Sequence, residues 1–306
     1  MWNIEADGGR QGEHRDLALD ILTALNPDVV LQQEAKHSRE RGKRLMHAAE
    51  RRLGLRGFLS TPNPGVDADI ATAVYLRPSM FHVAEQRPHA KPFWMHPCHV
   101  QAQLGDCPVP LNFVSAHLCF FDAGRRLEEA GWLTTLAKPG MVTLVGMDSN
   151  SYPKAPEPTA LPNWDTVADR PHMVQRTYMD ADGHRRSDNR PDAALIEAGY
   201  VDLARHAADH LEHKVEDVLA PTAGYGKPHQ GGPQRIDRTY AAGGLATALQ
   251  YVEVIDTDDT REVSDHALLL FRFNRARLEC VLTQPRTIAA HEGGPLRHPG
   301  LNTERD

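Results

Sequence analysis

The sequence predicts an α/β fold in which β-sheets are covered by helices on their outer faces. Two observations predict it. Short apolar runs separated by Pro and Gly recur along most of the chain, and amphipathic helical patterns fall into two batches. No repeat of about 20 to 50 residues is visible. With 306 residues, 41% of them hydrophobic, the chain is long enough for one large domain or two small ones.

Apolar periodicity assigns the elements in order. Helices are expected at 15–25, 38–53, 125–136, 193–199 and 201–218. Strands are expected at 1–4, 28–33, 71–76, 81–84, 100–104, 110–118, 142–145, 235–240, 249–255 and 267–273. A long polar loop is expected at 171–191. The sequence therefore predicts a domain at 1–276, followed by a polar, flexible tail at 277–306 that is rich in Gly, Pro and charge.

The charge of the chain limits the partners that it can bind. Its net charge is -7 and its pI is near 6.2. Nonspecific affinity for nucleic acid comes from many Lys and Arg contacts to phosphate, so a broad nucleic-acid-binding surface is not expected. An anionic substrate must therefore be held locally, and a bound metal ion is the expected means.

The cysteines and the apolar stretches indicate a compartment. The four cysteines show no CxxC spacing, and a chain of this length does not need a disulfide framework, so we expect reduced thiols in the cytoplasm. Residues 1–10 contain neither a basic start nor an apolar run. No stretch approaches the roughly 18 to 20 apolar residues that span a bilayer. We therefore expect a cytoplasmic protein without a membrane partner, and nothing indicates an obligate protein partner.

Several apolar runs end abruptly in a carboxylate, amide or imidazole. These runs end at Glu34, at His117, at Asp148 with Asn150, at Asp237, and at Asp265 with His266. A single case means little, because strands commonly stop at a polar residue. Several strand ends that converge, however, can hold polar groups in a fixed geometry. The pattern therefore predicts one site assembled from distant parts of the chain.

These runs resemble, in order and spacing, the motifs of the endonuclease/exonuclease/phosphatase superfamily, which has the fold of DNase I. The matching segments are Trp2-Asn3-Ile4, Pro27 to Glu34, Ser115-Ala116-His117-Leu118, Gly146-Met147-Asp148-Ser149-Asn150, Arg235-Ile236-Asp237 and Ser264-Asp265-His266. Each is weak alone, but six in order form a specific signal covering residues 1 to about 273. The resemblance implies a four-layer α/β/β/α sandwich with its site at one edge of the paired sheets.

The resemblance also implies a metal centre. Glu34 is expected to be the principal ligand, assisted by Asn3 and by Asp265. Carboxylate and amide oxygens suit Mg2+, and Mn2+ is also possible. Glu5 occupies a position that is acidic in some relatives, although it could equally be a solvated loop residue.

The remaining motif residues are assigned catalytic roles by the same resemblance. Asp148 is expected to orient or deprotonate the attacking water, and Asn150 to hydrogen-bond the phosphate or that water. His266 is expected at the scissile phosphate, with its ring held by Asp237. His117 resembles the histidine of the DNase I and phosphatase branches, whereas enzymes similar to exonuclease III generally carry a tyrosine there. This residue favours a role other than abasic-site repair.

The segment at 170–190 is rich in arginine and is a candidate for substrate binding. Arg176, Tyr178 and Arg186 are its expected contacts, because arginine binds phosphate through paired donors and an aromatic ring can stack on a base. A solvated loop whose aspartates cancel the charge explains the same residues equally well.

Three functions remain open. The first is a Mg2+-dependent phosphodiesterase that acts on nucleic acid or a nucleotide-like diester, and we favour it because the catalytic set is complete. The second is a phosphomonoesterase acting on a phosphorylated small molecule such as an inositol or sugar phosphate, which the acidic surface fits at least as well. A noncatalytic binding module is disfavoured by the retention of every reactive position.

Overall fold

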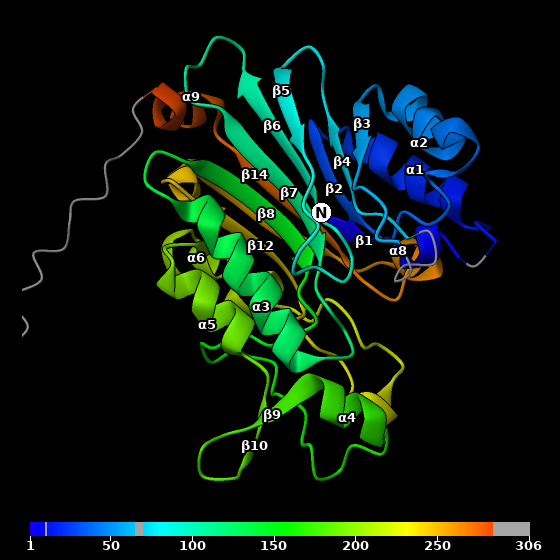
Figure 1. Cartoon of the computed structure of the whole chain (residues 1–306), viewed down its shortest axis with the longest axis vertical. Helices are drawn as coiled ribbons and strands as arrows, with labels where there is room; N and C mark the ends of the chain where they lie inside the picture. The colour runs from blue at the N-terminus through cyan, green and yellow to red at the C-terminus, as the bar shows by residue number, and fades with distance from the viewer. Residues whose placement is uncertain (10, 65–69, 284–306) are drawn as a thin grey trace, which may run out of the picture.

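The structure is a computed structural model that describes residues 1–9, 11–64 and 70–283. Two β-sheets face each other at its centre (Figure 1). The first contains β1 (Trp2–Asn3), β2 (Val29–Gln33), β4 (Ala73–Leu76) and β3 (Arg56–Leu59), in that order. The hairpin of β13 (Leu249–Ile255) and β14 (Leu268–Phe273) lies beside β1, where Leu269 N donates to Met1 O at 2.9 Å.

The second sheet is longer and carries most of the buried strands. Across the described residues its order is β11 (Val201–Asp202), β12 (Asp237–Ala242), β8 (Val142–Asp148), β7 (Leu111–His117), β6 (Cys98–Leu104) and β5 (Phe81–Arg87). Strands β7 and β8 are parallel and are buried along their whole length. Because both faces are covered, apolar residues occupy both faces of these strands, and the polar side chains of Asn112, Ser115 and Thr143 hydrogen-bond to backbone carbonyls in the interior.

Helices cover the outer face of each sheet. On the first sheet, α1 (Arg15–Leu25) and α2 (Glu40–Leu53) pack Leu22 and Met46 against strand residues such as Val30. On the second sheet, α3 (Ala123–Leu133) and α5 (Arg190–Glu197) pack Leu133 and Leu195 against β7 and β8. The remaining helices are α4 (Arg170–Arg176), α6 (Leu203–His210), α7 (Val215–Val218), α8 (Asp258–Val263) and α9 (Arg275–Thr283). These layers confirm the predicted α/β/β/α sandwich.

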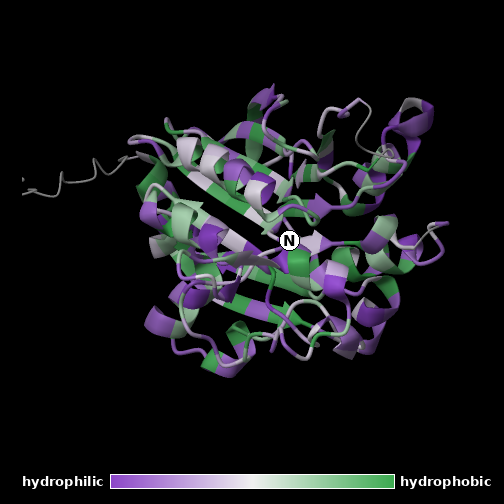
Figure 2. Ribbon diagram, turned by 60° about the horizontal axis from the view of Figure 1, so that its bottom comes forward, coloured by the Kyte–Doolittle hydropathy of each residue, from purple (hydrophilic) through white to green (hydrophobic). Residues whose placement is uncertain are grey.

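Apolar side chains fill the space between the two sheets. Leu31 and Val74 of the first sheet meet Phe113 and Leu144 of the second in one cluster. Figure 2 shows the same distribution, with hydrophobic residues on the strands and hydrophilic ones on the outer surfaces of the helices. Burial of this apolar surface is the main force that holds the sheets together.

The sheets approach closely near the C-terminal end of β8. A Cβ atom on Gly146 would lie only 2.8 Å from Leu31 Cδ1 and 2.9 Å from Met1 Cγ. A residue with a side chain at this position would have to push the first sheet away, because such contacts are shorter than van der Waals packing allows. Glycine therefore permits the close approach that brings the polar ends of strands from both sheets together.

Several predicted elements differ from the structure. The prediction of a polar loop at 171–191 is wrong. This segment contains most of α4, the short hairpin of β9 (Thr177–Met179) and β10 (Arg185–Ser187), and the start of α5. The helix expected at 201–218 is divided into β11, α6 and α7. Strand β3 and helix α8 were not predicted. These elements are short, and so they carry little periodic signal.

The prediction of a flexible tail from residue 277 is also wrong for residues 277–283, which belong to a helix. Helix α9 extends through Thr283, and its Leu282 is fully buried in the cluster between the sheets. Leu278 and Val281, both partly buried, pack against the same cluster, so these side chains tie the helix to the core although its composition resembles that of a loop. The rest of the expected tail, 284–306, lies outside the described residues.

A buried ion pair fastens the segment of α4, β9 and β10 to the second sheet. Arg126 of α3 contacts Asp188 at 2.8 Å, and both side chains are fully buried. The same guanidinium donates to Gln175 O at the end of α4, at 2.8 Å, and to Cys119 O, at 2.8 Å. We name α4, β9 and β10 together the α4 arm; Figure 1 shows it projecting below α3.

Among the helices of the described residues, none combines the length and the apolar character that crossing a membrane requires.

Replacing Arg126 should destabilise the protein strongly. In Arg126→Met, Asp188 loses a fully buried partner, and breaking a buried pair in this way costs about 3 to 5 kcal/mol of unfolding free energy. Urea unfolding measures the effect. The matched control is Arg186→Ala, which removes a pair with Asp180 whose arginine is 58% exposed, so the free energy of unfolding should change far less. Equal losses in the two variants would contradict the anchoring role of Arg126.

Candidate active site

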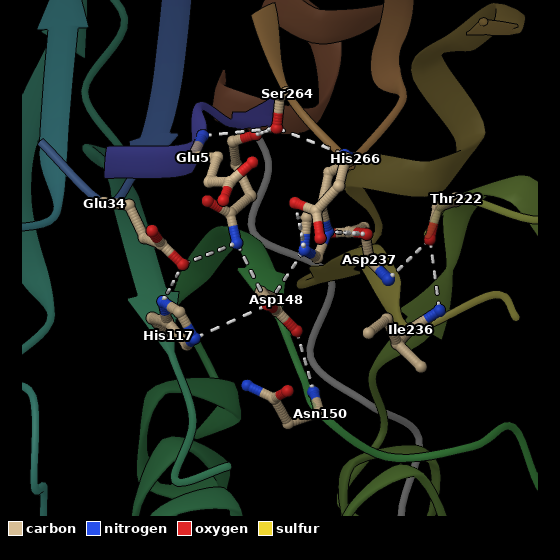
Figure 3. Close-up of polar contacts among 12 residues, drawn as sticks. Glu5, Glu34, His117, Asp148, Asn150, Thr222, Ile236, Asp237, Ser264 and His266 are labelled. Carbon is tan, nitrogen blue, oxygen red and sulfur yellow. Dashed lines mark hydrogen bonds and ion pairs between the residues drawn. The ribbon is translucent and has the colours of Figure 1, made fainter. Parts of the chain in front are cut away.

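Three neighbouring strands of the second sheet carry polar residues in one row. In the parallel pair of β7 and β8, His117 is opposite Asp148. In the antiparallel pair of β12 and β8, Asp237 is opposite the same Asp148. Strand register alone therefore places residues from three distant segments side by side, and Figure 3 shows them around Asp148.

Asp148 is the centre of this row, and its carboxylate is only 2% exposed. Asn3 Nδ2, from the first sheet, donates to Asp148 Oδ2 at 3.0 Å, and the Asn150 backbone N–H donates to Oδ1 at 3.0 Å. Burial alone would raise the pKa of Asp148, but the positive charges that His117 and His266 can carry hold this pKa below its ordinary value of 3.8. The carboxylate is therefore ionised and can accept a proton.

Asp237 holds the ring of His266. Its Oδ2 lies 2.7 Å from His266 Nδ1, and the far nitrogen, Nε2, lies 3.9 Å from Asp148 Oδ2. Burial would lower the pKa of His266, but the charges of Asp237, Asp148 and Asp265 together raise it to about 10. At neutral pH the ring is an imidazolium, and its Nε2 also lies 3.6 Å from Asp265 Oδ1, so neither carboxylate is within hydrogen-bond distance of this nitrogen. Figure 3 shows the ring between Asp237 and Asp148.

Acidic side chains gather beside this pair. Glu34 directly follows β2 and is held with a φ of 59°, a left-handed conformation that is unusual for a residue other than glycine. Its Oε2 accepts from the Ala6 backbone N–H at 3.0 Å, and the carboxylate is 23% exposed. Partial burial, followed by the negative charge of Asp265, raises the pKa of Glu5, with Glu34 adding to the effect. Nearby carboxylates thus repel one another here, which favours binding of a cation.

The donor atoms at this position fit a hard cation. Glu34 and Asp265 provide carboxylate oxygens, and Asn3 Oδ1 is buried without a hydrogen-bond partner among the described residues. Such oxygen donors are the ligands that Mg2+ prefers. Lys227 pairs with Asp265 and so neutralises part of its charge.

A second group of residues also lies close enough to hold an ion. Ligand atoms of Asp148, Asp237 and His266 lie within 4.8 Å of one another. However, His266 Nδ1 already contacts Asp237, and the ring carries a proton at neutral pH, so it cannot donate a lone pair to a metal. The oxygen donors near Glu34 therefore fit a cation better than this group does.

A cavity of about 260 Å³ opens in front of the row. Most of the predicted site residues line it: Glu34, His117, Asp148, Asn150, Asp265, His266 and Arg176. Asn3 and Asp237 are fully buried and contact these lining residues instead. The structure thus brings together all eight residues that were predicted for catalysis and metal binding.

The three predicted substrate contacts lie in different places. Arg176 lines the cavity, and its Nη1 is buried without a hydrogen-bond partner among the residues that the structure describes. Tyr178 instead lies under Arg190, with 4.3 Å between the guanidinium carbon and the ring centre. Arg186 pairs with Asp180 on the surface of the β9–β10 hairpin. Only Arg176 faces the cavity.

Sequence reasoning did not select several residues that line the cavity. They are His172 of α4, Lys227 and Gln230 from the loop before β12, and Trp94 and Phe120 on the opposite wall. The sequence does contain a signal for Phe120, because two consecutive phenylalanines follow the His117 strand in a segment that is too short to form another strand. Lys227 precedes a single 3-10 turn at Pro228–Gln230, in a polar segment, and nothing in the sequence distinguishes Lys227 and Gln230 from solvated residues.

Comparison with known proteins identifies the fold. No model of a known protein family matches the chain, and no curated protein sequence matches it either. The chain is structurally similar to an AP endonuclease from Archaeoglobus fulgidus, with a TM-score of 0.58 and 15% identity, covering 89% of this chain and 97% of the other.

Two proteins from Bacteroides thetaiotaomicron are structurally similar to this chain to about the same degree. One is an endonuclease/exonuclease/phosphatase family protein, with a TM-score of 0.56 and 14% identity over 87% of this chain and 93% of the other. The second is a mannosyl-6-phosphatase, with a TM-score of 0.57 and 13% identity over 88% of this chain and 97% of the other. Together with the two facing sheets and their covering helices, these similarities show that the chain has the DNase I-like fold of the endonuclease/exonuclease/phosphatase superfamily.

Proposed function

We propose that this chain is a Mg2+-dependent phosphoesterase that hydrolyses phosphodiester bonds, as a nuclease or a nucleotide-type phosphodiesterase. One observation carries the proposal: an ionised carboxylate, an imidazolium and a group of acidic oxygen donors meet at one cavity. Hydrolysis of a phosphate ester requires a proton acceptor for water, positive charge at the phosphate and neutralisation of the non-bridging oxygens. The cavity offers a group for each requirement.

Glu34, Asn3 and Asp265 would hold the cation, which could also be Mn2+. When bound, it supplies positive charge to the phosphate oxygens and to the leaving group. Glu34 is the principal ligand because its carboxylate lines the cavity and Asn3 Nδ2 and the Ala6 N–H hold it in place, at 3.4 Å and 3.0 Å.

Asp148 and Asn150 would act on the attacking water. The Asp148 carboxylate stays ionised and lines the cavity, so it can orient the water and accept its proton. Asn150 lies next to it in a left-handed conformation with a φ of 49°, and its Nδ2 donates to Leu118 O at 2.9 Å. With its amide hydrogen committed in this way, Asn150 presents its remaining polar groups to water or phosphate in one fixed orientation.

His266 would donate its Nε2 proton to a phosphate oxygen, and Asp237 keeps the ring oriented and charged. His117 lines the same cavity, with its Nε2 3.5 Å from Asp148 Oδ2, and would hydrogen-bond the phosphate or donate a proton to it. Arg176, on the α4 arm, lines the cavity and would bind a non-bridging oxygen with its guanidinium group.

A phosphomonoesterase acting on a small sugar or inositol phosphate is the second candidate. The size of the cavity, about 260 Å³, favours it, and one structurally similar protein is a mannosyl-6-phosphatase. Turnover in the presence of Mg2+ of plasmid DNA, bis(p-nitrophenyl) phosphate and p-nitrophenyl phosphate distinguishes the two. Cleavage of the diesters supports our proposal, and cleavage of the monoester alone supports the second candidate. Failure on all three at any Mg2+ concentration would contradict both.

Glu34→Gln should nearly abolish turnover. The substitution keeps the size of the side chain but removes the main anionic oxygen ligand, so kcat/KM for bis(p-nitrophenyl) phosphate should fall by ~100-fold or more. Titration with Mn2+, followed by electron paramagnetic resonance, should show weaker binding. The matched control is Glu197→Gln, which changes an exposed glutamate of α5 and should leave both measurements unchanged. Wild-type activity in Glu34→Gln would exclude this glutamate as a ligand.

Arg176→Ala should weaken substrate binding. Loss of a charged hydrogen bond to phosphate raises KM by roughly 10- to 100-fold. Arg186→Ala, in the same arm, serves for comparison: its guanidinium pairs with Asp180 at 2.8 Å, so KM should change little. Steady-state kinetics on one diester measures both. A similar rise in the two variants would mean that the overall charge of the arm, and not Arg176, binds the substrate.

Asp237→Asn should lower the pKa of His266. In the wild type the charged ring stabilises the fold fully below its unfolded pKa of 6.5, and this stabilisation is lost as the pH rises through about 10. Without the Asp237 charge the ring loses its proton at lower pH, so the alkaline limb of the pH-rate profile should move to lower pH. Histidine NMR titration of the metal-free protein provides an independent readout. An unaltered profile and titration would show that the pair does not control His266.

A further inference from the structure

Three aromatic rings form a cluster beside the cavity. Trp94 lies 5.4 Å from Phe120 and 5.5 Å from Phe121, and the two phenylalanines lie 5.2 Å apart, all in edge-to-face geometry. Phe120 is 42% exposed and Phe121 is 40% exposed. We name these three residues the aromatic wall. Rings this large are usually buried, so their exposure beside a cavity indicates a binding surface.

The aromatic wall is continuous with the candidate active site. Trp94 and Phe120 line the same cavity as His117 and Asp148. Trp94 is half-buried, and its indole Nε1 is among its buried atoms, so the part of its side chain that remains accessible is the apolar ring. Arg176 lines the cavity as well, from the α4 arm. The cavity therefore combines an apolar aromatic surface with the positively charged guanidinium of Arg176.

Buried hydrogen bonds hold the aromatic wall in place. Glu129 of α3 is fully buried, and its two carboxylate oxygens accept from Trp94 N at 2.8 Å and from Cys119 N at 2.6 Å. Asn63 Nδ2 donates to Trp94 O at 2.7 Å. One carboxylate thus connects the two loops that carry the rings. Because the loops are already ordered, a ligand that stacks here does not have to meet the entropic cost of ordering them.

We propose that the aromatic wall binds the nucleobase next to the scissile phosphate, so that the substrate is a nucleotide diester or a nucleic-acid strand. This inference rests on the proposed phosphodiesterase function. A planar base offers the π face that aromatic side chains stack on, whatever its identity. A phosphate bound at Arg176 and His266 would leave the attached nucleoside next to Trp94 and Phe120, because all four residues line one cavity.

The same rings suit a lipid surface less well. Asp122 directly follows Phe121 and caps α3 by accepting from Gly124 N and Arg125 N, so a carboxylate lies at the edge of the aromatic wall. The chain has a net charge of -7, which anionic lipid headgroups repel. Phosphatidylcholine vesicles test this alternative. The proposal would be overturned if the wild-type protein bound the vesicles and Phe120→Ala lost this binding while its preference for a substrate with a base stayed unchanged.

The test compares two diesters with the same leaving group. One is the p-nitrophenyl ester of thymidine 5′-monophosphate, and the other is methyl p-nitrophenyl phosphate, which lacks a base. In Phe120→Ala, KM for the nucleotide ester should rise about 5- to 100-fold, whereas KM for the methyl ester should not change. Phe120→Leu, which keeps an apolar side chain but no ring, should show most of this effect. Ile196→Ala, at an exposed apolar residue of α5, is the control and should alter neither KM.

If KM changed equally for the two esters in Phe120→Ala, or did not change, the inference would be overturned. Turnover of the esters by the wild type would still support the phosphodiesterase function. If the wild type cleaves neither ester, the proposed function fails, and calorimetry decides about the aromatic wall. Wild-type protein should then bind thymidine 5′-monophosphate more tightly than deoxyribose 5-phosphate, and Phe120→Ala should lose this preference. Equal binding of the two ligands by the wild type would overturn the inference.

Discussion

A set of buried hydrogen bonds between the two sheets determines where the reactive groups lie. Asn3 donates to Asp148 across the sheets, and Gln33 Nε2 donates to Ser115 Oγ at 2.9 Å and to Gly146 O at 3.2 Å. A buried polar atom without a partner costs more than a hydrogen bond gains, so these contacts fix the sheets relative to each other more specifically than apolar packing does. A shift of one residue in either sheet would break several of them together, and the row around Asp148 depends on this register.

Much of this arrangement could be predicted because it follows from local patterns. Strands β7 and β8 end at His117 and Asp148, and Glu34 directly follows β2. Strand β12 instead begins at Asp237, and because it runs antiparallel to β8 its first residue lies at the same edge. The sequence pattern therefore predicts that His117, Asp148 and Asp237 belong to one site. The helices at 15–25 and 40–53 were equally accessible, since their apolar positions repeat over several turns.

What could not be predicted depends on contacts between distant residues. The α4 arm reads as a polar loop because β9 and β10 are three residues each and mostly solvent-facing, and the arm is held by Arg126 and Asp188, which lie far apart in the sequence. Trp94 lies in no element that the sequence predicts, and its contact with Phe120 depends on the fold. Helix α9 could not be predicted because the Gly, Pro and charged residues around it are typical of a loop. The burial of Leu282 depends on the folded core and not on any local pattern.

Helix α3 contacts both walls of the cavity through residues on one of its faces. Arg126 holds the α4 arm, which carries Arg176, and Glu129, one turn further along, holds the loops of Trp94 and Phe120. A displacement of this helix would therefore move both walls of the cavity at once. A substitution that breaks only one of the two anchors would release one wall while the other stays held, and so would change the width of the opening and the molecules that fit into it.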